Sequence, residues 1–296
     1  MTSAAASSAT VVTPAVLREW PLPFGTQSKE SRGRALVVGG SVPNPGGALL
    51  AARAAMRAGA GKIQLVVPEP VAIPLAVAMP ESLTRGAPCS PEGDLLPEAA
   101  PVIKDCATKA DATLIGPGML DADHARDCVT AAAPHLHGTV IVDALALAWL
   151  TEDPTRGRSF DQCICSPNLT ELALTLGEDA DAVAADPAAA VLRLAEITGA
   201  VVTSGAASTW TAAPDGRLWR TDEGNPGLGV SGSGDVKAGI MLGLSARGAD
   251  PIQAALWAST LHGTIGGRLA SRYGATGFLA GELPGEIPQA LLELQG

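Results

Sequence analysis

Short apolar runs alternate with stretches of helical periodicity as far as about residue 203, and this alternation restricts the fold more than any other feature. The segment 34–39, with the sequence RALVVG, is apolar at consecutive positions, as in a strand that is covered on both faces. A helix is predicted at about 46–58, and helical stretches lie between most of the strands. Further strands of this kind are expected at 62–67, 112–115, 139–142, 163–165 and 200–203. The sequence therefore predicts an α/β fold with a mostly parallel central sheet and helices on both faces.

The pattern then changes, and two short segments with strand character replace the alternation. Segments 208–211 and 217–220 flank Pro214-Asp215-Gly216, which is a turn signal. This arrangement predicts a small antiparallel hairpin near 207–220. The rest of the chain is expected to be helical, over about 235–246, 251–270 and 280–292.

The chain of 296 residues has no linker-like break in composition, so residues 13–296 are expected to form one domain. Residues 1–12 are mostly small and polar and are expected to be disordered. Hydrophobic residues make up 47% of the chain, which is enough for a sizeable buried core. The helices are rich in small residues that are compatible with self-association, and a homo-oligomer is expected.

Charge and composition argue against several function classes. The net charge is −10 and the Lys and Arg residues are scattered, so a nucleic-acid partner is not expected. The sequence contains neither an apolar stretch long enough to span a membrane nor a secretory signal, and a cytoplasmic protein without a membrane partner is predicted. The five cysteines show no CxxC spacing, so they are expected to be buried and reduced.

The segment 224–240, GNPGLGVSGSGDVKAGI, is a glycine-rich loop that runs into a predicted helix. Glycines allow successive backbone N–H groups to converge on one point, and a helix start adds free N–H groups and a positive dipole end. This combination is suited to a phosphoryl group in transfer. Asp235 would repel phosphate, but it is well placed to accept a proton from a hydroxyl that attacks the phosphorus. The alternative is a flexible turn in which Asp235 only caps the helix.

This loop resembles the signature of the ADP- or ATP-dependent NAD(P)H-hydrate dehydratases, a family of the ribokinase-like superfamily. The resemblance covers nearly the whole chain, from about residue 13 to residue 290. The block 29–41, KESRGRALVVGGS, looks like the opening strand of the family. Further blocks match in order at 46–61, 80–81, 115–118, 142–144 and 261–263.

The resemblance implies a repair reaction on hydrated NADH or NADPH. ADP or ATP, with Mg²⁺, would phosphorylate the ring hydroxyl, and elimination of phosphate would restore the cofactor. Asp235 would be the catalytic base and a substrate contact, and the other implied substrate contacts are Ala48, Gly118 and Asn168. The implied nucleotide site comprises Ser204, Gly205, Ala206, Ala207, Ser208, Asn225, Gly232, Ser233 and Gly234.

The segment 166–171, SPNLTE, departs from the Thr-Pro-His-Pro-Gly-Glu that is usual in the family, because Asn168 replaces the histidine. The broader superfamily carries Asn-x-x-Glu here, and Asn168 and Glu171 match it. Glu171 would then order water around a nucleotide-bound Mg²⁺, a cation that usually keeps several waters. The alternative is a helix start with Glu171 in its first turn.

A second departure follows the strand 200–203, where the family usually has Lys-Gly and this chain has Ser204-Gly205. Charge-assisted hydrogen bonds contribute about 1.5–3 kcal/mol, so loss of the lysine predicts weaker nucleotide binding. One hypothesis is that Lys237, which stands where the family commonly has an apolar residue, restores positive charge. Two residues along a helix are roughly 200° apart, however, and this favours a solvated lysine that points away from Asp235.

Two residues outside the loop carry weaker signals. Asp143 ends a predicted strand and either faces the site or serves as a structural cap. His262 lies in an apolar helical stretch and is expected to be a hydrogen-bonded packing residue.

Two other functions stay open at the level of sequence. A ribokinase-like small-molecule kinase would begin with the same transfer but release the phosphorylated product. A degenerate homologue would bind nucleotide without turnover, and Ser204 and the altered 166–171 segment motivate this alternative.

Overall fold

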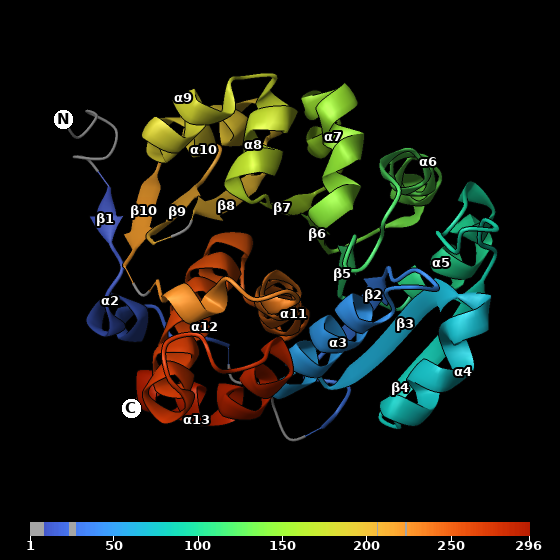
Figure 1. The fold of residues 1–296 in the computed structure, drawn as a ribbon, viewed down its shortest axis with the longest axis horizontal. Coiled ribbons are helices and arrows are strands. Elements are labelled where there is room, and N and C mark those ends of the chain that lie inside the picture. Colours follow the sequence, from blue (N-terminus) through green and yellow to red (C-terminus); the bar gives the residue numbers. More distant parts are fainter. Residues whose placement is uncertain (1–8, 24–27, 206, 223) are drawn as a thin grey trace.

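The computed structural model describes residues 9–23, 28–205, 207–222 and 224–296, which form a ten-stranded sheet in the order β1-β10-β9-β8-β7-β6-β5-β2-β3-β4 (Figure 1). The strands are β1 (Thr10–Val11), β2 (Arg34–Val38), β3 (Lys62–Pro68), β4 (Ser82–Ala87), β5 (Ala112–Ile115), β6 (Thr139–Asp143), β7 (Gln162–Ser166), β8 (Val201–Gly205), β9 (Thr209–Ala212) and β10 (Leu218–Thr221).

The part of the sheet from β4 to β8 is parallel throughout, as the apolar runs predict. β9 and β10 form the predicted antiparallel hairpin, and β9 also pairs antiparallel with β8. The hairpin therefore extends the main sheet. β4 was not expected from the sequence, because its segment SLTRGA has few apolar residues and forms an edge with alternating exposure.

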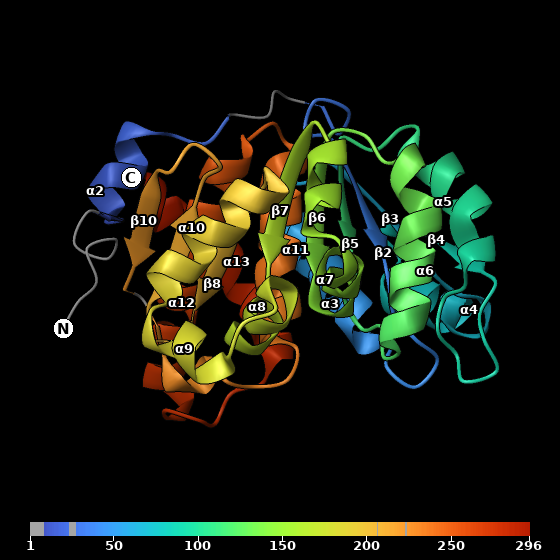
Figure 2. The same cartoon turned by 90° about the horizontal axis from the view of Figure 1, so that it is seen from above.

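Helices cover both faces of the sheet (Figure 2). α3, α11, α12 and α13 pack on one face, and α6, α7, α8 and α10 pack on the other. The α-helices are α2 (Pro14–Glu19), α3 (Gly46–Arg57), α4 (Glu69–Ala78), α5 (Ala100–Ala107), α6 (Ala122–Ala132), α7 (Ala148–Glu152), α8 (Leu169–Leu176), α9 (Ala180–Ala185), α10 (Pro187–Thr198), α11 (Ser233–Ala246), α12 (Pro251–Tyr273) and α13 (Leu283–Gln295).

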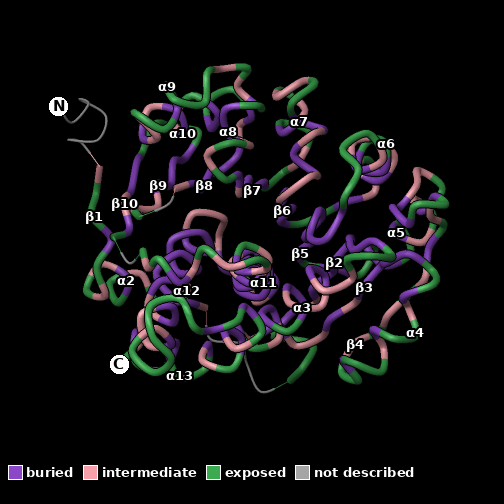
Figure 3. The backbone as a smooth tube through the Cα atoms, viewed as in Figure 1, coloured by how far each residue is buried: buried purple, intermediate pink, exposed green. Residues whose placement is uncertain are grey.

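Two hydrophobic cores lie between these layers. On β2, Ala35 and Val37 belong to the core under α3 and α11, whereas Leu36 and Val38 belong to the core under α6 and α7. All four side chains are fully buried, which explains why the strand is apolar at consecutive positions. Figure 3 shows the buried backbone concentrated along the sheet and the helix sides that face it.

Glycines allow α11 to lie very close to α3. A Cβ atom added to Gly239 would come within 2.2 Å of the Ala51 carbonyl oxygen, and one added to Gly243 within 2.3 Å of the Ala55 carbonyl oxygen. The small residues that dominate the composition thus bring two helix backbones into contact. This contact fixes the position of α11, whose first turn carries the glycine-rich signature.

The N-terminal segment corrects one prediction. Residues 1–8, expected to be disordered, lie outside the described residues. Thr10 and Val11, also in that segment, pair with β10 in parallel, and the Val12 N–H donates to the Arg220 carbonyl at 2.8 Å. These residues are ordered because the β-branched run TVV adds a strand to an open sheet edge.

The five cysteines are free thiols, four of them are buried, and Cys163 and Cys165 point to one face of β7 with their sulfurs 4.0 Å apart. None of the described helices combines the length and apolarity needed to cross a membrane.

Candidate active site

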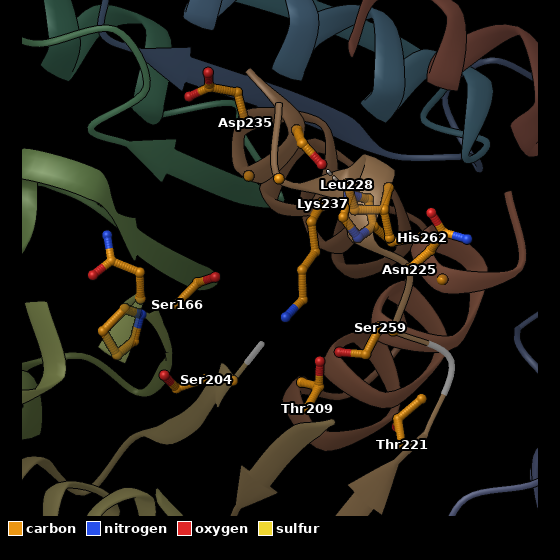
Figure 4. A pocket seen from close by; sticks show the side chains of 18 of the residues that line it. Ser166, Ser204, Thr209, Thr221, Asn225, Leu228, Asp235, Lys237, Ser259 and His262 are labelled. Carbon is orange, nitrogen blue, oxygen red and sulfur yellow. Dashed lines mark hydrogen bonds between the residues drawn. The ribbon is translucent and has the colours of Figure 1, made fainter. Parts of the chain in front are cut away.

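A cavity of about 680 Å³ lies at the carboxyl ends of β6, β7 and β8, where parallel α/β sheets place their ligands (Figure 4). The loop before α11, the first turn of that helix and the middle of α12 complete its wall. Its polar and charged side chains are those of Asp143, Ser166, Asn168, Glu171, Ser204, Thr209, Thr221, Asn225, Ser233, Asp235, Lys237, Ser259 and His262.

The glycine-rich loop opens the amino end of α11 to this cavity. Gly232 caps the helix in a left-handed conformation with φ 90°, and it has no side chain to accept from the first turn. The Ser233 N–H donates to the Val230 carbonyl at 3.1 Å. Among the described residues, the N–H groups of Gly234 and Asp235 have no acceptor. The Gly232 N–H has no acceptor among the described residues either, so two of the three amides of the predicted 232–234 cradle are free and Asp235 adds a further donor. Such groups are suited to an anion.

Asp235 lies inside the cavity with no ion-pair partner among the described residues. Its Oδ2 atom is 3.1 Å from the position that a Cβ atom would take at Gly47, in the first turn of α3. Burial raises the pKa of Asp235 to about 6. The group is thus mostly ionised at neutral pH while being a stronger base than an ordinary aspartate, as a proton acceptor in catalysis should be.

His262 of α12 holds the loop through Ser233. The Ser233 Oγ and His262 Nε2 atoms are 2.8 Å apart and hydrogen-bonded. Burial, together with the charge of Lys237, lowers the pKa of His262 to about 3, so the imidazole stays neutral. The expected hydrogen bond of His262 is confirmed, and the residue also lines the cavity. The block 261–263 matched the family, but nothing in the sequence indicated that His262 would contact the glycine-rich segment.

The position of the Lys237 side chain differs from the solvated position that the sequence favoured. Its side chain lines the cavity and extends towards β8, where Nζ lies 3.4 Å from Thr203 Oγ1 (Figure 4). Burial lowers its pKa to about 8, although the nearby Asp143 acts in the opposite direction. The expectation of a solvated lysine was wrong because α11 begins inside the cavity. Side chains that leave its first turn in opposite directions therefore still reach the site.

Asp143 at the end of β6 faces the same cavity and is 5% exposed. Burial raises its pKa well above the ordinary value, and the charges of Asp235 and Glu171 act in the same direction. Lys237 and a hydrogen bond with Ser166 oppose this shift. Its surroundings therefore favour the protonated form of Asp143 more than those of an exposed aspartate would.

The start of α8 forms a second wall of the cavity and is closed by its own side chains. The Glu171 N–H donates to Asn168 Oδ1, and the Asn168 N–H donates to Glu171 Oε2, both at 2.9 Å. This is a complete capping box, so the structural alternative for the SPNLTE segment is present. Both residues also line the cavity, and burial raises the pKa of Glu171.

The residues predicted to contact nucleotide divide into two groups. Ser204, Gly205, Ala207, Asn225 and the 232–234 segment line the cavity. Ser208 does not, and its hydroxyl donates to Asp222 at 2.8 Å. Ala206 lies outside the described residues.

Two of the predicted substrate contacts lie away from the cavity lining. Ala48 is completely buried in the core under α3 and α11. Gly118 is also buried, and a Cβ atom at Gly47 would come within 2.7 Å of its N atom, so it borders the region beside Asp235. The substrate roles of Ala48 and Gly118 stay predictions.

A family model described as NAD(P)H-hydrate dehydratase matches residues 35–289. An ADP-dependent (S)-NAD(P)H-hydrate dehydratase of Xanthomonas campestris pv. campestris is 42% identical over 283 residues, which are 96% of this chain and 96% of the relative. The chain belongs to the NAD(P)H-hydrate dehydratase family.

Solved structures agree with membership of this family. An ADP/ATP-dependent NAD(P)H-hydrate dehydratase of Bacillus subtilis, co-crystallized with ATP/Mg²⁺, is 27% identical with a TM-score of 0.82, covering 97% of this chain and 99% of that one. A ribokinase-like superfamily protein of Enterococcus faecalis is 20% identical with a TM-score of 0.80, covering 98% of both chains. The second similarity concerns the fold alone, and together they confirm the predicted ribokinase-like architecture.

Proposed function

We propose that this chain dehydrates hydrated NADH or NADPH in a reaction that consumes ADP or ATP. The first turn of α11 carries this proposal, because an unpaired carboxylate lies there beside backbone N–H groups that lack an acceptor among the described residues. Phosphorylation of a hydroxyl requires a proton acceptor next to an anion site. Membership of the dehydratase family supports the same reaction.

Asp235 and the adjacent amides divide the first step between them. The ring hydroxyl oxygen attacks the terminal phosphorus of the nucleotide, its proton passes to Asp235, and the bond from phosphorus to the leaving AMP or ADP breaks. The N–H groups of Gly234 and Asp235 would stabilise charge on the transferring group. The bond between the ring carbon and the phosphate oxygen then breaks, and loss of a proton from the neighbouring ring carbon restores NADH or NADPH.

We propose that the nucleotide phosphates occupy the side of the cavity formed by Ser204, Gly205 and Ala207, with Asn225 nearby. The hydrated nicotinamide would lie beside Asp235, near Gly47 and Gly118. Asn168 is exposed on the cavity wall, which leaves its side-chain nitrogen accessible to substrate while its oxygen caps α8.

The residues present fit a magnesium ion held together with the nucleotide. Glu171 uses Oε2 to accept from Asn168, and Oε1 stays available to a water. Among the described residues, no group of three or more His, Cys, Asp or Glu could hold a metal alone. Mg²⁺ commonly binds through one or two carboxylates, substrate phosphates and water, and it would neutralise phosphate charge here.

The assay follows recovery of NADPH absorbance from hydrated NADPH with ADP, with ATP and without nucleotide. Recovery is expected only with nucleotide and Mg²⁺, with one phosphate released per cofactor repaired. Recovery without nucleotide would contradict the mechanism. A phosphorylated product that accumulates would instead identify a kinase, and nucleotide binding without either product would identify a degenerate homologue.

Two broader predictions belong to this proposal. Cytoplasmic location would bring the enzyme to the pool of reduced cofactor. Self-association is proposed from the small-residue helices and is testable by light scattering.

A further inference from the structure

Lys237 is the only lysine or arginine among the described residues that line the cavity, whereas three carboxylates line it. The carboxylates are Asp143, Glu171 and Asp235. A cavity with this balance would repel a nucleotide phosphate chain unless a cation offset it. The position of the one lysine therefore decides where phosphate can bind.

The ammonium group of Lys237 has unused hydrogen-bonding capacity. It has three N–H donors, and its one described hydrogen bond is to the Thr203 hydroxyl at 3.4 Å. No carboxylate lies within ion-pair distance of it among the described residues. A mostly buried cation with one long neutral contact lacks the anionic partner that such groups require.

A second polar group on the same wall also lacks a partner. Ser204 is 1% exposed and its Oγ atom is buried without a hydrogen bond among the described residues, although the residue lines the cavity. Ser204 follows Thr203 at the end of β8, so its side chain leaves the strand on the opposite face from the Thr203 hydroxyl that Lys237 contacts, and the two unsatisfied groups flank the same strand end. Figure 4 shows Lys237 reaching towards Ser204 and Thr209 while the Asp235 carboxylate points away from it.

We propose that Lys237 binds the phosphate chain of the nucleotide and that Ser204 donates to the same chain. This inference rests on the proposed function and specifies which residues recognise the phosphoryl donor. The cation comes from the helix start because the strand end carries a serine. The first turn of α11 then has the base on one side, the phosphate-binding lysine on the other, and free amides between them.

The charge of Lys237 makes this site sensitive to pH. The titratable groups around it are Asp143 from β6, Glu171 from α8, Asp235 on α11 itself and His262 from α12. Because the pKa of Lys237 is lowered to about 8, the side chain is protonated below that pH and neutral above it. Affinity for the phosphate chain is expected to decrease as pH rises through about 8.

Calorimetric titration of the full chain with ADP and with adenosine separates phosphate recognition from a structural role. Lys237→Met keeps most of the unbranched side chain and removes the charge, and Lys237→Arg keeps a charge that does not titrate. Lys104→Met, on the exposed side of α5, removes one positive charge outside the cavity and serves as the control. Thermal melts of all four proteins accompany the titrations.

At pH 7, Lys237→Met is expected to weaken ADP on the order of 10- to 100-fold while adenosine binds as before. Lys104→Met should leave both affinities unchanged, and Lys237→Arg should abolish the decrease near pH 8. Unchanged ADP affinity in Lys237→Met, or an equal loss for ADP and adenosine, would overturn the inference. If the wild-type chain binds ADP with this dependence but repairs no hydrated cofactor, the proposed function fails and the phosphate site stands.

Discussion

Two helix starts face the same cavity, and they leave their backbone groups in opposite states. At α8, Asn168 and Glu171 accept from each other's N–H groups and close the helix end. At α11, Gly232 provides no side-chain acceptor, and the Gly234 and Asp235 N–H groups have no partner among the described residues. The N–H groups of Leu169 and Thr170 at α8 also lack an acceptor among the described residues, but neither residue lines the cavity, whereas Gly234 and Asp235 do. The helix start that is suited to an anion is therefore the one whose N-cap residue lacks a side-chain acceptor.

The two starts are also held in place differently. α8 is fixed locally by its capping box, whereas α11 is fixed by close packing of Gly239 and Gly243 on the backbone of α3. A helix that must leave its end open cannot rely on its own cap. Its position has to come from tertiary contacts further along the helix.

The largest difference between the starts is expected from removing one carboxylate at each. Asp235→Asn should reduce turnover about 10²- to 10⁴-fold, because a general base contributes that much. Burial penalises the ionised aspartate, so this variant should also be more stable than the wild type at pH 7. Glu171→Gln keeps an acceptor for the Asn168 N–H and should lose far less activity. Steady-state kinetics with saturating nucleotide and Mg²⁺ measure both.

Melting temperatures control for misfolding in this pair. Comparable losses of turnover in Asp235→Asn and Glu171→Gln would show that the two helix starts do not have different roles. Full activity in Asp235→Asn would contradict the assignment of the base.

The pH dependence of kcat/KM should reflect only the titratable groups at the start of α11. Asp235 must be ionised, so activity is expected to rise about tenfold per pH unit below its pKa of about 6. Lys237 must be protonated, so activity at limiting nucleotide should fall above its pKa of about 8. The result is a bell between these values, measured with hydrated NADPH at a series of pH values. In Lys237→Arg the upper limb should disappear while the lower limb remains.

Much of the fold follows from the sequence because it depends on local patterns. Consecutive apolar residues such as 35–38 predicted the parallel strands, and the Pro-Asp-Gly turn predicted the hairpin. The edges of the sheet were missed at β1 and β4. As an edge strand, β4 buries only part of its surface, so its sequence lacks the apolar signal that identifies a central strand. β1 is β-branched but has only two residues, which are too few to show a period.

The candidate site likewise has features that could be predicted from local sequence and features that could not. The glycine loop and Asp235 were identified because helix-start chemistry is encoded within a few consecutive residues. Helical geometry correctly predicted that Lys237 points away from Asp235, but it did not predict that this direction leads into the cavity, because it gives the angle between two side chains and not where the cavity lies around the helix. The Ser233–His262 contact joins residues 29 positions apart, and such a pairing has no local signature.

Packing of α11 can be tested with one extra methyl group. Gly239→Ala places a Cβ atom where the Ala51 carbonyl lies 2.2 Å away, so the helices must separate. The free energy of unfolding is expected to decrease by about 1–3 kcal/mol. Turnover should also decrease, because the start of α11 moves. Gly267→Ala in α12 is the matched control, because no described atom outside the adjacent turns of its own helix lies within 4 Å of its Cβ position. That variant should be as stable as the wild type or roughly 0.5–1 kcal/mol more stable. Denaturant titration measures both, and equal stabilities would show that the close contact does not position α11.

The smallest effect is expected from a substitution at the start of α8. Asn168→Ala removes the acceptor for the Glu171 N–H, and loss of an N-cap reduces the free energy of unfolding by about 0.5–2 kcal/mol. Asn168→Ser restores a capping oxygen and should recover that stability, because Ser-x-x-Glu is also a capping box. The serine variant separates the two roles of Asn168. If the asparagine only caps α8, kcat/KM should follow stability and return to the wild-type value. If its side-chain nitrogen also contacts the hydrated cofactor, Asn168→Ser will be stable but will have a raised KM for that substrate.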